Sequence, residues 1–103
     1  MEYLISSPKT HSENVEIDKI FARYHNIKGT QNADKGRIKK ALQDFNEAIK
    51  LNPEYSPAYF NRGTIKADLG DFAGAKVDFE RARELERFYF ENPGINLEYT
   101  NNV

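Results

Sequence analysis

The sequence predicts an all-α protein made of two stacked antiparallel helical hairpins. Its spacing repeats after 34 residues, so that Ala41, Phe45 and Ala48 return as Ala75, Phe79 and Ala82. Within each repeat, apolar residues recur at helical intervals, and Gly or Pro separates the helical segments. A fixed period of this length is typical of stacked helical repeats. The two repeats cover about residues 22–55 and 56–89.

Size and composition restrict the class of protein. The 103 residues form one small domain, and the formal net charge of −1 gives no general attraction to nucleic acid or to anionic membranes. The absence of cysteine excludes disulfides and thiolate chemistry, and we expect no metal site and no cofactor. No apolar stretch approaches the roughly 20 residues of a membrane span, and no secretory leader is visible. We therefore expect a soluble, cytoplasmic protein.

The first helix follows a loose N-terminal arm of residues 1–13. Its start is predicted near Ser12, and Gly36 closes it by taking the left-handed conformation. A spacing near 3.6 predicts one amphipathic face, whose apolar members are Val15, Ile17, Ile20, Phe21, Tyr24 and Ile27. The repeat domain accordingly spans residues 14–90, and a C-terminal tail follows at 91–103.

The second and third helices meet at a proline turn. Residues 37–51 place one apolar stripe on a helix, made of Ile38, Ala41, Leu42, Phe45, Ala48 and Ile49. Pro53 ends this helix, because proline disfavours the helical conformation in the residue before it. The third helix runs to about Leu69, with Ser56 as its predicted N-cap and Pro57 at the first helical position.

The fourth helix follows Gly70. We expect Asp71 to cap it, and the side chains predicted to be buried are Phe72, Ala75, Phe79, Ala82 and Leu85. Small residues at equivalent positions of the two repeats let the helices of each hairpin approach closely. These residues are Gly29, Ala41 and Ala48 in the first repeat and Gly63, Ala75 and Ala82 in the second. Phe45 and Phe79 are then expected to fill the wider gap between hairpins.

This pattern resembles the tetratricopeptide repeat family. The residues that carry the resemblance are Gly29, Gly36, Ala41, Phe45, Ala48, Pro53, Tyr59, Gly63, Gly70, Phe72, Ala75, Phe79 and Ala82. His25 and Lys28 depart from it, because the family prefers a large aromatic residue and a leucine there. Arg87 replaces the terminal proline of the second repeat, which suggests that the fourth helix continues through Tyr89.

The resemblance implies a non-catalytic scaffold whose first and third helices line a concave groove for a peptide or a partner protein. At the family's groove positions stand Asn26, Thr30, Asp34, Phe60, Asn61, Thr64 and Asp68. This polar set with one large aromatic residue suits an extended backbone with one apolar anchor. Alternatively, these residues are simply solvated faces of the helices.

The end of the stack gives a second hypothesis. Lys76 and Arg83 replace Leu42 and Ile49 at the matching positions, which favours a terminal repeat with a polar outer face and a chain that is complete at this end. The aromatic cluster Phe88, Tyr89 and Phe90 cannot all point inward from one helix. Two interpretations remain open: a lid over the last hairpin, with Ile95 and Leu97 folding back, or a patch for homo-oligomer formation.

Catalytic chemistry finds no support in the sequence. His11 and His25 are isolated, and no phosphate-binding glycine loop is present. A basic run, made of Lys35, Arg37, Lys39 and Lys40, surrounds one turn and is read as a solvated helix start; contact with an acidic partner or an RNA backbone is the alternative, although no nucleic-acid partner is predicted. The predicted function is protein binding in the groove, and the alternative is a self-associating structural module without a separate ligand.

Overall fold

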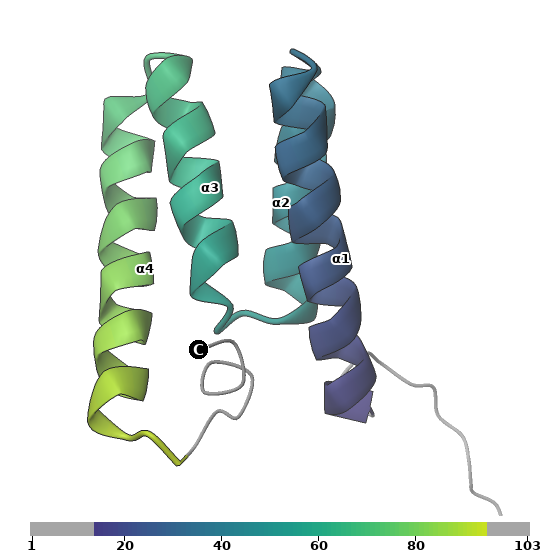
Figure 1. The fold of residues 1–103 in the computed structure, drawn as a ribbon. Coiled ribbons are helices and arrows are strands. Elements are labelled where there is room, and N and C mark those ends of the chain that lie inside the picture. The colour runs from purple at the N-terminus through teal and green to yellow at the C-terminus, as the bar shows by residue number, and fades with distance from the viewer. Residues whose placement is uncertain (1–13, 95–103) are drawn as a thin grey trace, which may run out of the picture.

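The computed structural model describes residues 14–94, and these form four α-helices with no strand among them. The helices are α1 (Val15–Asp34), α2 (Ile38–Leu51), α3 (Ser56–Asp68) and α4 (Phe72–Glu91). In Figure 1, α1 and α2 form one antiparallel hairpin, and α3 and α4 form a second hairpin beside it. The predicted fold class is therefore confirmed. The predicted arm, 1–13, and residues 95–103 of the predicted tail lie outside the described residues.

Local signals in the sequence explain where the helices begin and end. Asp71 caps α4 as predicted, since its Oδ1 accepts a hydrogen bond from the backbone N–H of Gly74 at 2.9 Å. Gly36 and Gly70 follow α1 and α3 with φ angles of +78° and +89°, a conformation that costs glycine little and other residues more. Asn14 caps α1, and its Oδ1 accepts from the N–H of Ile17 at 3.2 Å.

The predicted N-cap of α3 is wrong. Tyr55 occupies the cap position with an extended backbone, and Ser56 is already the first helical residue, so that Pro57 comes second. The Ser56 side chain is buried and its Oγ donates to Glu86 Oε2 at 3.3 Å. The Ser56 hydroxyl thus contacts α4 instead of capping α3. A sequence pattern cannot distinguish these two roles, because the same hydroxyl serves in both.

The core lies where the two hairpins meet. One cluster of buried side chains joins Ala22, Ala48 and Ala58, and a second joins Ala41, Phe45 and Ile65. Within the first hairpin, Gly29 faces the Phe45 ring so closely that a Cβ atom there would overlap it. A Cβ atom on Gly63 would lie 2.8 Å from the Phe79 ring in the second hairpin. The predicted role of these small residues, close approach of paired helices, is confirmed.

The predicted burial of Phe72 is wrong, and Phe79 is only partly buried, because its ring packs on Phe60 of the same hairpin instead of filling the gap between the hairpins. Phe72 is the first residue of α4 and is 71% exposed, on a surface that it shares with Ala67 of α3 and Ala75 of α4. The apolar face of α1 is also exposed: Val15, Ile17, Ile20, Phe21, Tyr24 and Ile27 are each between 46% and 56% accessible. The residues of α1 that face the core are instead Ala22, Asn26 and Gly29. The 3.6-residue spacing revealed an apolar face without revealing which face the neighbouring helices cover.

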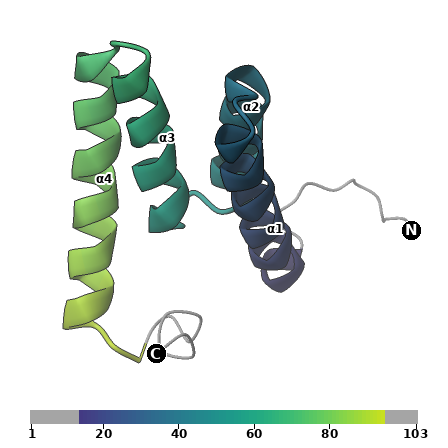
Figure 2. The ribbon, with the colours of Figure 1, turned by 45° about the horizontal axis from the view of Figure 1, so that its top comes forward.

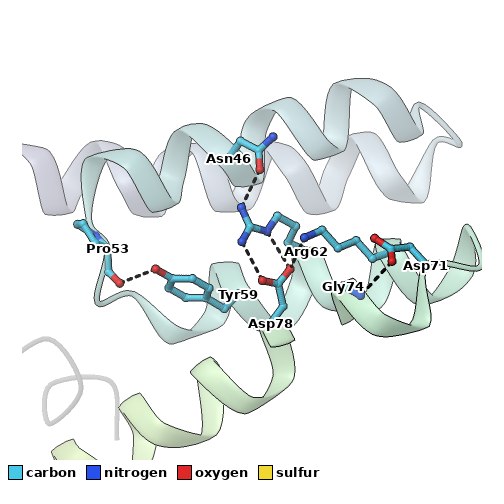
Figure 3. A network of polar contacts seen from close by, with 8 residues as sticks. Asn46, Pro53, Tyr59, Arg62, Asp71, Gly74 and Asp78 are labelled. Carbon is cyan, nitrogen blue, oxygen red and sulfur yellow. Dashed lines mark hydrogen bonds and ion pairs between the residues drawn. The ribbon is translucent and has the colours of Figure 1, made fainter. Parts of the chain in front are cut away.

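A polar network connects three helices (Figure 3). Arg62 of α3 donates to Asp78 of α4 through Nε and Nη2, at 2.8 Å each, and to Asn46 Oδ1 of α2 at 2.9 Å. Lys66 Nζ also lies 3.2 Å from Asp78 Oδ2. Because the Asp78 side chain is only 2% exposed, these donors satisfy a carboxylate that would be costly to bury alone.

Candidate functional site

The proposed groove lies along α1 and α3. These helices run in the same direction, because a single helix separates them in the chain, and their carboxyl ends both lie at the top of Figure 1. Asn61 Nδ2 of α3 donates to Asn26 Oδ1 of α1 at 3.0 Å, which joins the two helices directly. Of the seven predicted groove residues, Asn26 is buried, and the other six are at least partly accessible on these two helices: Thr30, Asp34, Phe60, Asn61, Thr64 and Asp68.

Asn26 has a supporting place in this arrangement. It is 8% exposed, and its amide oxygen accepts the hydrogen bond from Asn61. The Asn61 side chain remains partly accessible. The Asn26–Asn61 hydrogen bond therefore fixes the orientation of an amide that lies between the two helices, which reduces the entropy that a ligand contact with Asn61 would cost.

The two threonines make matching local bonds. Thr30 Oγ1 donates to the carbonyl oxygen of Ile27 at 2.8 Å, and Thr64 Oγ1 donates to that of Phe60 at 3.0 Å. Each hydroxyl proton is therefore engaged within its own helix, and each oxygen presents lone pairs as a hydrogen-bond acceptor. The pair offers acceptors for backbone N–H groups or for a cationic side chain.

Asp34 and Asp68 close the series at the last residues of α1 and α3, and both are exposed. Helix carboxyl ends carry a partial negative charge from unpaired carbonyl groups, to which each carboxylate adds. Lys35 caps α1 directly after Asp34 and begins the basic run of the turn to α2, whereas Lys66 in the last turn of α3 is paired with Asp78. This end of the two helices therefore carries two exposed carboxylates, with basic side chains beside the one on α1.

Phe60 lies one helical turn before Thr64 on α3 and is about half exposed, and its ring turns toward α4. Its ring packs on Phe79 of α4, with the ring centroids 5.4 Å apart. With Phe79 it lines a hollow on the outer side of the second hairpin, whose remaining walls are Ala82, Arg83 and Glu86. We name this surface the outer hollow. The sequence analysis did not predict this hollow, although the repeat register contains a signal for it. Phe60 and Phe79 stand 34 residues after Asn26 and Phe45, which the second hairpin covers, and no third hairpin among the described residues covers Phe60 and Phe79.

The predicted aromatic cluster on α4 is divided between two environments. Tyr89 is buried, and its hydroxyl donates to Glu54 Oε1 at 2.9 Å in the turn between α2 and α3. Phe88 is about half exposed and packs edge-on against the Tyr89 ring, whereas Phe90 is 86% exposed. Only Phe88 and Phe90 are therefore presented to a partner molecule, and α4 continues through Tyr89 as the sequence suggested.

Metal-binding clusters and membrane-spanning helices are absent from residues 14–94. No group of three or more His, Asp or Glu side chains there has the arrangement that would hold a metal ion. His25 lies beside Asp44, with its Nδ1 3.5 Å from Asp44 Oδ1, and its ring meets Tyr24 edge-on. In the same part of the chain, none of the helices is apolar over a length sufficient to cross a bilayer.

Known proteins contain similar sequences. Residues 29–70 match a family described as TPR repeat, and residues 56–89 match one described as tetratricopeptide repeat. The chain is 39% identical over 66 residues to an uncharacterized protein of Methanocaldococcus jannaschii, covering 64% of this chain and 77% of that relative. It is 36% identical over 84 residues to human tetratricopeptide repeat protein 36, covering 75% of this chain and 44% of that protein.

A larger enzyme also contains a similar segment. The UDP-N-acetylglucosamine–peptide N-acetylglucosaminyltransferase of Giardia intestinalis is 38% identical over 63 residues, which amount to 61% of this chain but only 4% of the enzyme. Proteins of this repeat type are generally non-catalytic scaffolds that mediate protein–protein interaction. With two hairpins in the structure and two repeats matched in the sequence, this chain belongs to the tetratricopeptide repeat family.

Proposed function

We propose that the surface shared by α1 and α3 binds an extended segment of a partner protein that carries a lysine or arginine side chain. The observation that carries this proposal is the position of Asp34 and Asp68 at the parallel carboxyl ends of the two helices. Two carboxylates added to two helix carboxyl ends attract a cation more strongly than one exposed carboxylate does.

The remaining groove residues support an extended backbone. The amide of Asn61, held by Asn26, provides both donor and acceptor groups between the helices. Thr30 and Thr64 provide acceptor oxygens on either side. Main-chain recognition of this kind supplies affinity with little sequence preference, and the cation at the acidic end then fixes the direction of the bound segment.

Phe60 is not part of this proposed surface, because its ring packs on Phe79. Recognition therefore depends on hydrogen bonds and exposed charges, and the affinity is expected to fall as salt is raised.

The test uses peptides selected on the wild-type protein from a random display library. A selected peptide is labelled and its affinity is measured by fluorescence anisotropy. We expect a lysine or arginine in the bound peptides, and its replacement by alanine should weaken binding about tenfold. The double variant Asp34→Lys, Asp68→Lys should bind the unchanged peptide at least about tenfold more weakly than the wild-type protein does.

A matched control carries the same change of charge elsewhere. Glu84→Lys with Glu91→Lys alters two exposed carboxylates on α4, away from the proposed groove. This variant should bind the peptide within about twofold of wild type at 0.15 M salt, where distant charges are screened. Equal weakening by both double variants, or selected peptides without a basic residue, would refute the proposal.

A further inference from the structure

Helix α1 has an exposed apolar face. Five residues of this face form one stripe, here called the α1 stripe: Ile17, Ile20, Phe21, Tyr24 and Ile27. The stripe lies on the side of the helix opposite Ala22 and Gly29, which face α2. Five large apolar side chains gathered on one face exceed the scattered apolar residues expected on a monomer surface and indicate an interaction site.

The repeat register identifies what such a face contacts. Phe21, Tyr24 and Ile27 stand 34 residues before Tyr55, Ala58 and Asn61. These three residues attach the second hairpin to the first: Ala58 packs with Ala22 and Ala48, Tyr55 packs on the same cluster, and Asn61 bonds to Asn26. The α1 stripe therefore occupies the helix face that α3 uses to dock on a preceding hairpin.

The opposite end of the molecule presents the surface that corresponds in the repeat register to the one that α3 covers, with Lys76 and Arg83 in place of Leu42 and Ile49. The outer hollow contains Phe60, Phe79 and Ala82, which stand 34 residues after Asn26, Phe45 and Ala48. In the first hairpin the corresponding surface is covered by α3. In Figure 2, α4 lies at the far side of the second hairpin from α1, so the two surfaces are at opposite ends of the described fold.

We propose that two copies of this chain associate head to tail, with the α1 stripe of one copy seated in the outer hollow of the next. The arrangement repeats the register in which α3 packs on the first hairpin. Hairpins of this type bury their apolar faces by stacking, and arrays usually need at least three of them for stability. A second copy supplies the missing neighbours without a new kind of interface.

Contacts inside the chain specify which residues would meet between copies. Arg62 Nη1 donates to Asn46 Oδ1 across the hairpins at 2.9 Å, and the matching pair between copies is Lys28 with Glu80, which carry opposite charges. The Asn61–Asn26 pair becomes Ile27 with Phe60, both apolar and exposed. The two residues of each matching pair are therefore complementary, by opposite charge in the first pair and by apolar character in the second.

This interface joins two different surfaces, so it is heterologous. Each added copy leaves one α1 stripe and one outer hollow unoccupied, and association therefore produces open chains of copies rather than a closed dimer. The proposed groove residues Asp34 and Asp68 lie outside both surfaces. The inference does not depend on the proposed function, and the variants that test the two are different.

The main experiment is sedimentation velocity on the full chain over a range of concentrations. For the wild type we expect an average mass that rises above the 11.9 kDa monomer as concentration increases. Tyr24→Asp blocks the α1 stripe and Phe60→Asp blocks the outer hollow; both side chains are exposed, and circular dichroism checks that helicity is intact. Each variant alone should be monomeric.

Mixing the two variants distinguishes head-to-tail association from its rivals. Each variant retains one intact surface, so an equimolar mixture should form a species of twice the monomer mass that grows no further. If Phe60→Asp alone still dimerises, the stripes pair with each other; if Tyr24→Asp alone still dimerises, the hollows do. Either result overturns the proposal, as does a wild type that stays monomeric at several hundred micromolar.

Exchanging the charges of Lys28 and Glu80 tests the proposed register between copies. It also provides a second test if an aspartate variant does not fold. Lys28→Glu or Glu80→Lys alone should weaken association about threefold, and the two together in one chain should restore it. Phe90→Asp on α4 is the control and should leave association unchanged. Loss of association in Phe90→Asp, without loss in Tyr24→Asp, would place the contact on the aromatic end of α4 and refute the proposal.

Discussion

Arg62 and Asp78 form a paired ion contact between α3 and α4, in which two guanidinium nitrogens each lie 2.8 Å from a different carboxylate oxygen. Burial raises the pKa of Asp78, but the hydrogen bonds from Arg62 and Lys66 outweigh it and hold the pKa of this carboxyl below its usual range. The same hydrogen bond raises the pKa of Arg62. The contact is therefore ionic throughout the neutral range and holds the second hairpin together.

Stability should depend on this carboxylate at low pH. A carboxyl whose pKa is lower in the folded state stabilises the fold above its unfolded pKa of about 3.9, and loses that contribution as pH falls through the folded pKa. Asp78→Asn should lower the free energy of unfolding by roughly 2–3 kcal/mol at pH 7. Urea unfolding at several pH values should show the difference shrinking below pH ~4; a constant difference would contradict this account.

The close approach of α1 and α2 should make Gly29 intolerant of substitution. Gly29→Ala places a methyl group against the buried Phe45 ring, and the overpacking should cost about 1–3 kcal/mol despite the better helix propensity of alanine. Gly63→Ala should cost less, because Phe79 is only partly buried and its ring can shift. Thermal unfolding followed by circular dichroism measures both, and the reverse order would contradict the packing argument.

Phe45 and Phe72 should respond very differently to truncation. Phe45→Ala removes a buried ring between the hairpins and should cost about 3–5 kcal/mol, enough to unfold a domain of this size. Phe72→Ala removes an exposed ring and should change stability by less than about 0.5 kcal/mol. Chemical denaturation of the two variants compares them; a large loss in Phe72→Ala would mean that another molecule covers this ring.

The N-cap of α4 should make a measurable contribution of its own. Asp71→Ala removes the acceptor for the Gly74 N–H, and the expected loss is about 1 kcal/mol. Asp68→Ala, three residues earlier, removes an exposed carboxylate that caps no helix and should be nearly neutral. Melting temperatures of the two variants separate loss of the cap from loss of a negative charge.

Much of the fold could be read from the sequence because its determinants are local. The 34-residue period, the left-handed glycines Gly36 and Gly70, and the cap Asp71 act within a few residues of their own positions. The close approach of the paired helices at Gly29 could be predicted as well, since the helices of a hairpin are neighbours in the chain, but its contact with the Phe45 ring was not predicted. The N-cap of α3 could not, because Ser56 satisfies its hydroxyl on a distant helix.

The candidate groove was predicted less completely. Thr64 and Asp68 lie on the accessible surface expected of them, but Asn26 is buried and Phe60 turns to Phe79. Spacing along one helix gives the angle at which a side chain leaves the axis, and the neighbouring hairpin decides what it meets. Tyr89 had a usable signal: it repeats Tyr55 at the 34-residue period, and both tyrosines pack inward.

The sequence by itself determined the number of hairpins, their breaks and the small residues that let the helices pair, because each depends on contacts close in the chain. Only the tertiary structure decided which apolar faces are covered. The stripe from Ile17 to Ile27 and the exposed ring of Phe72 have helical spacing no different from that of the core. Periodicity records that a face is apolar, whereas burial depends on the position of a second surface, which comes from packing between distant segments.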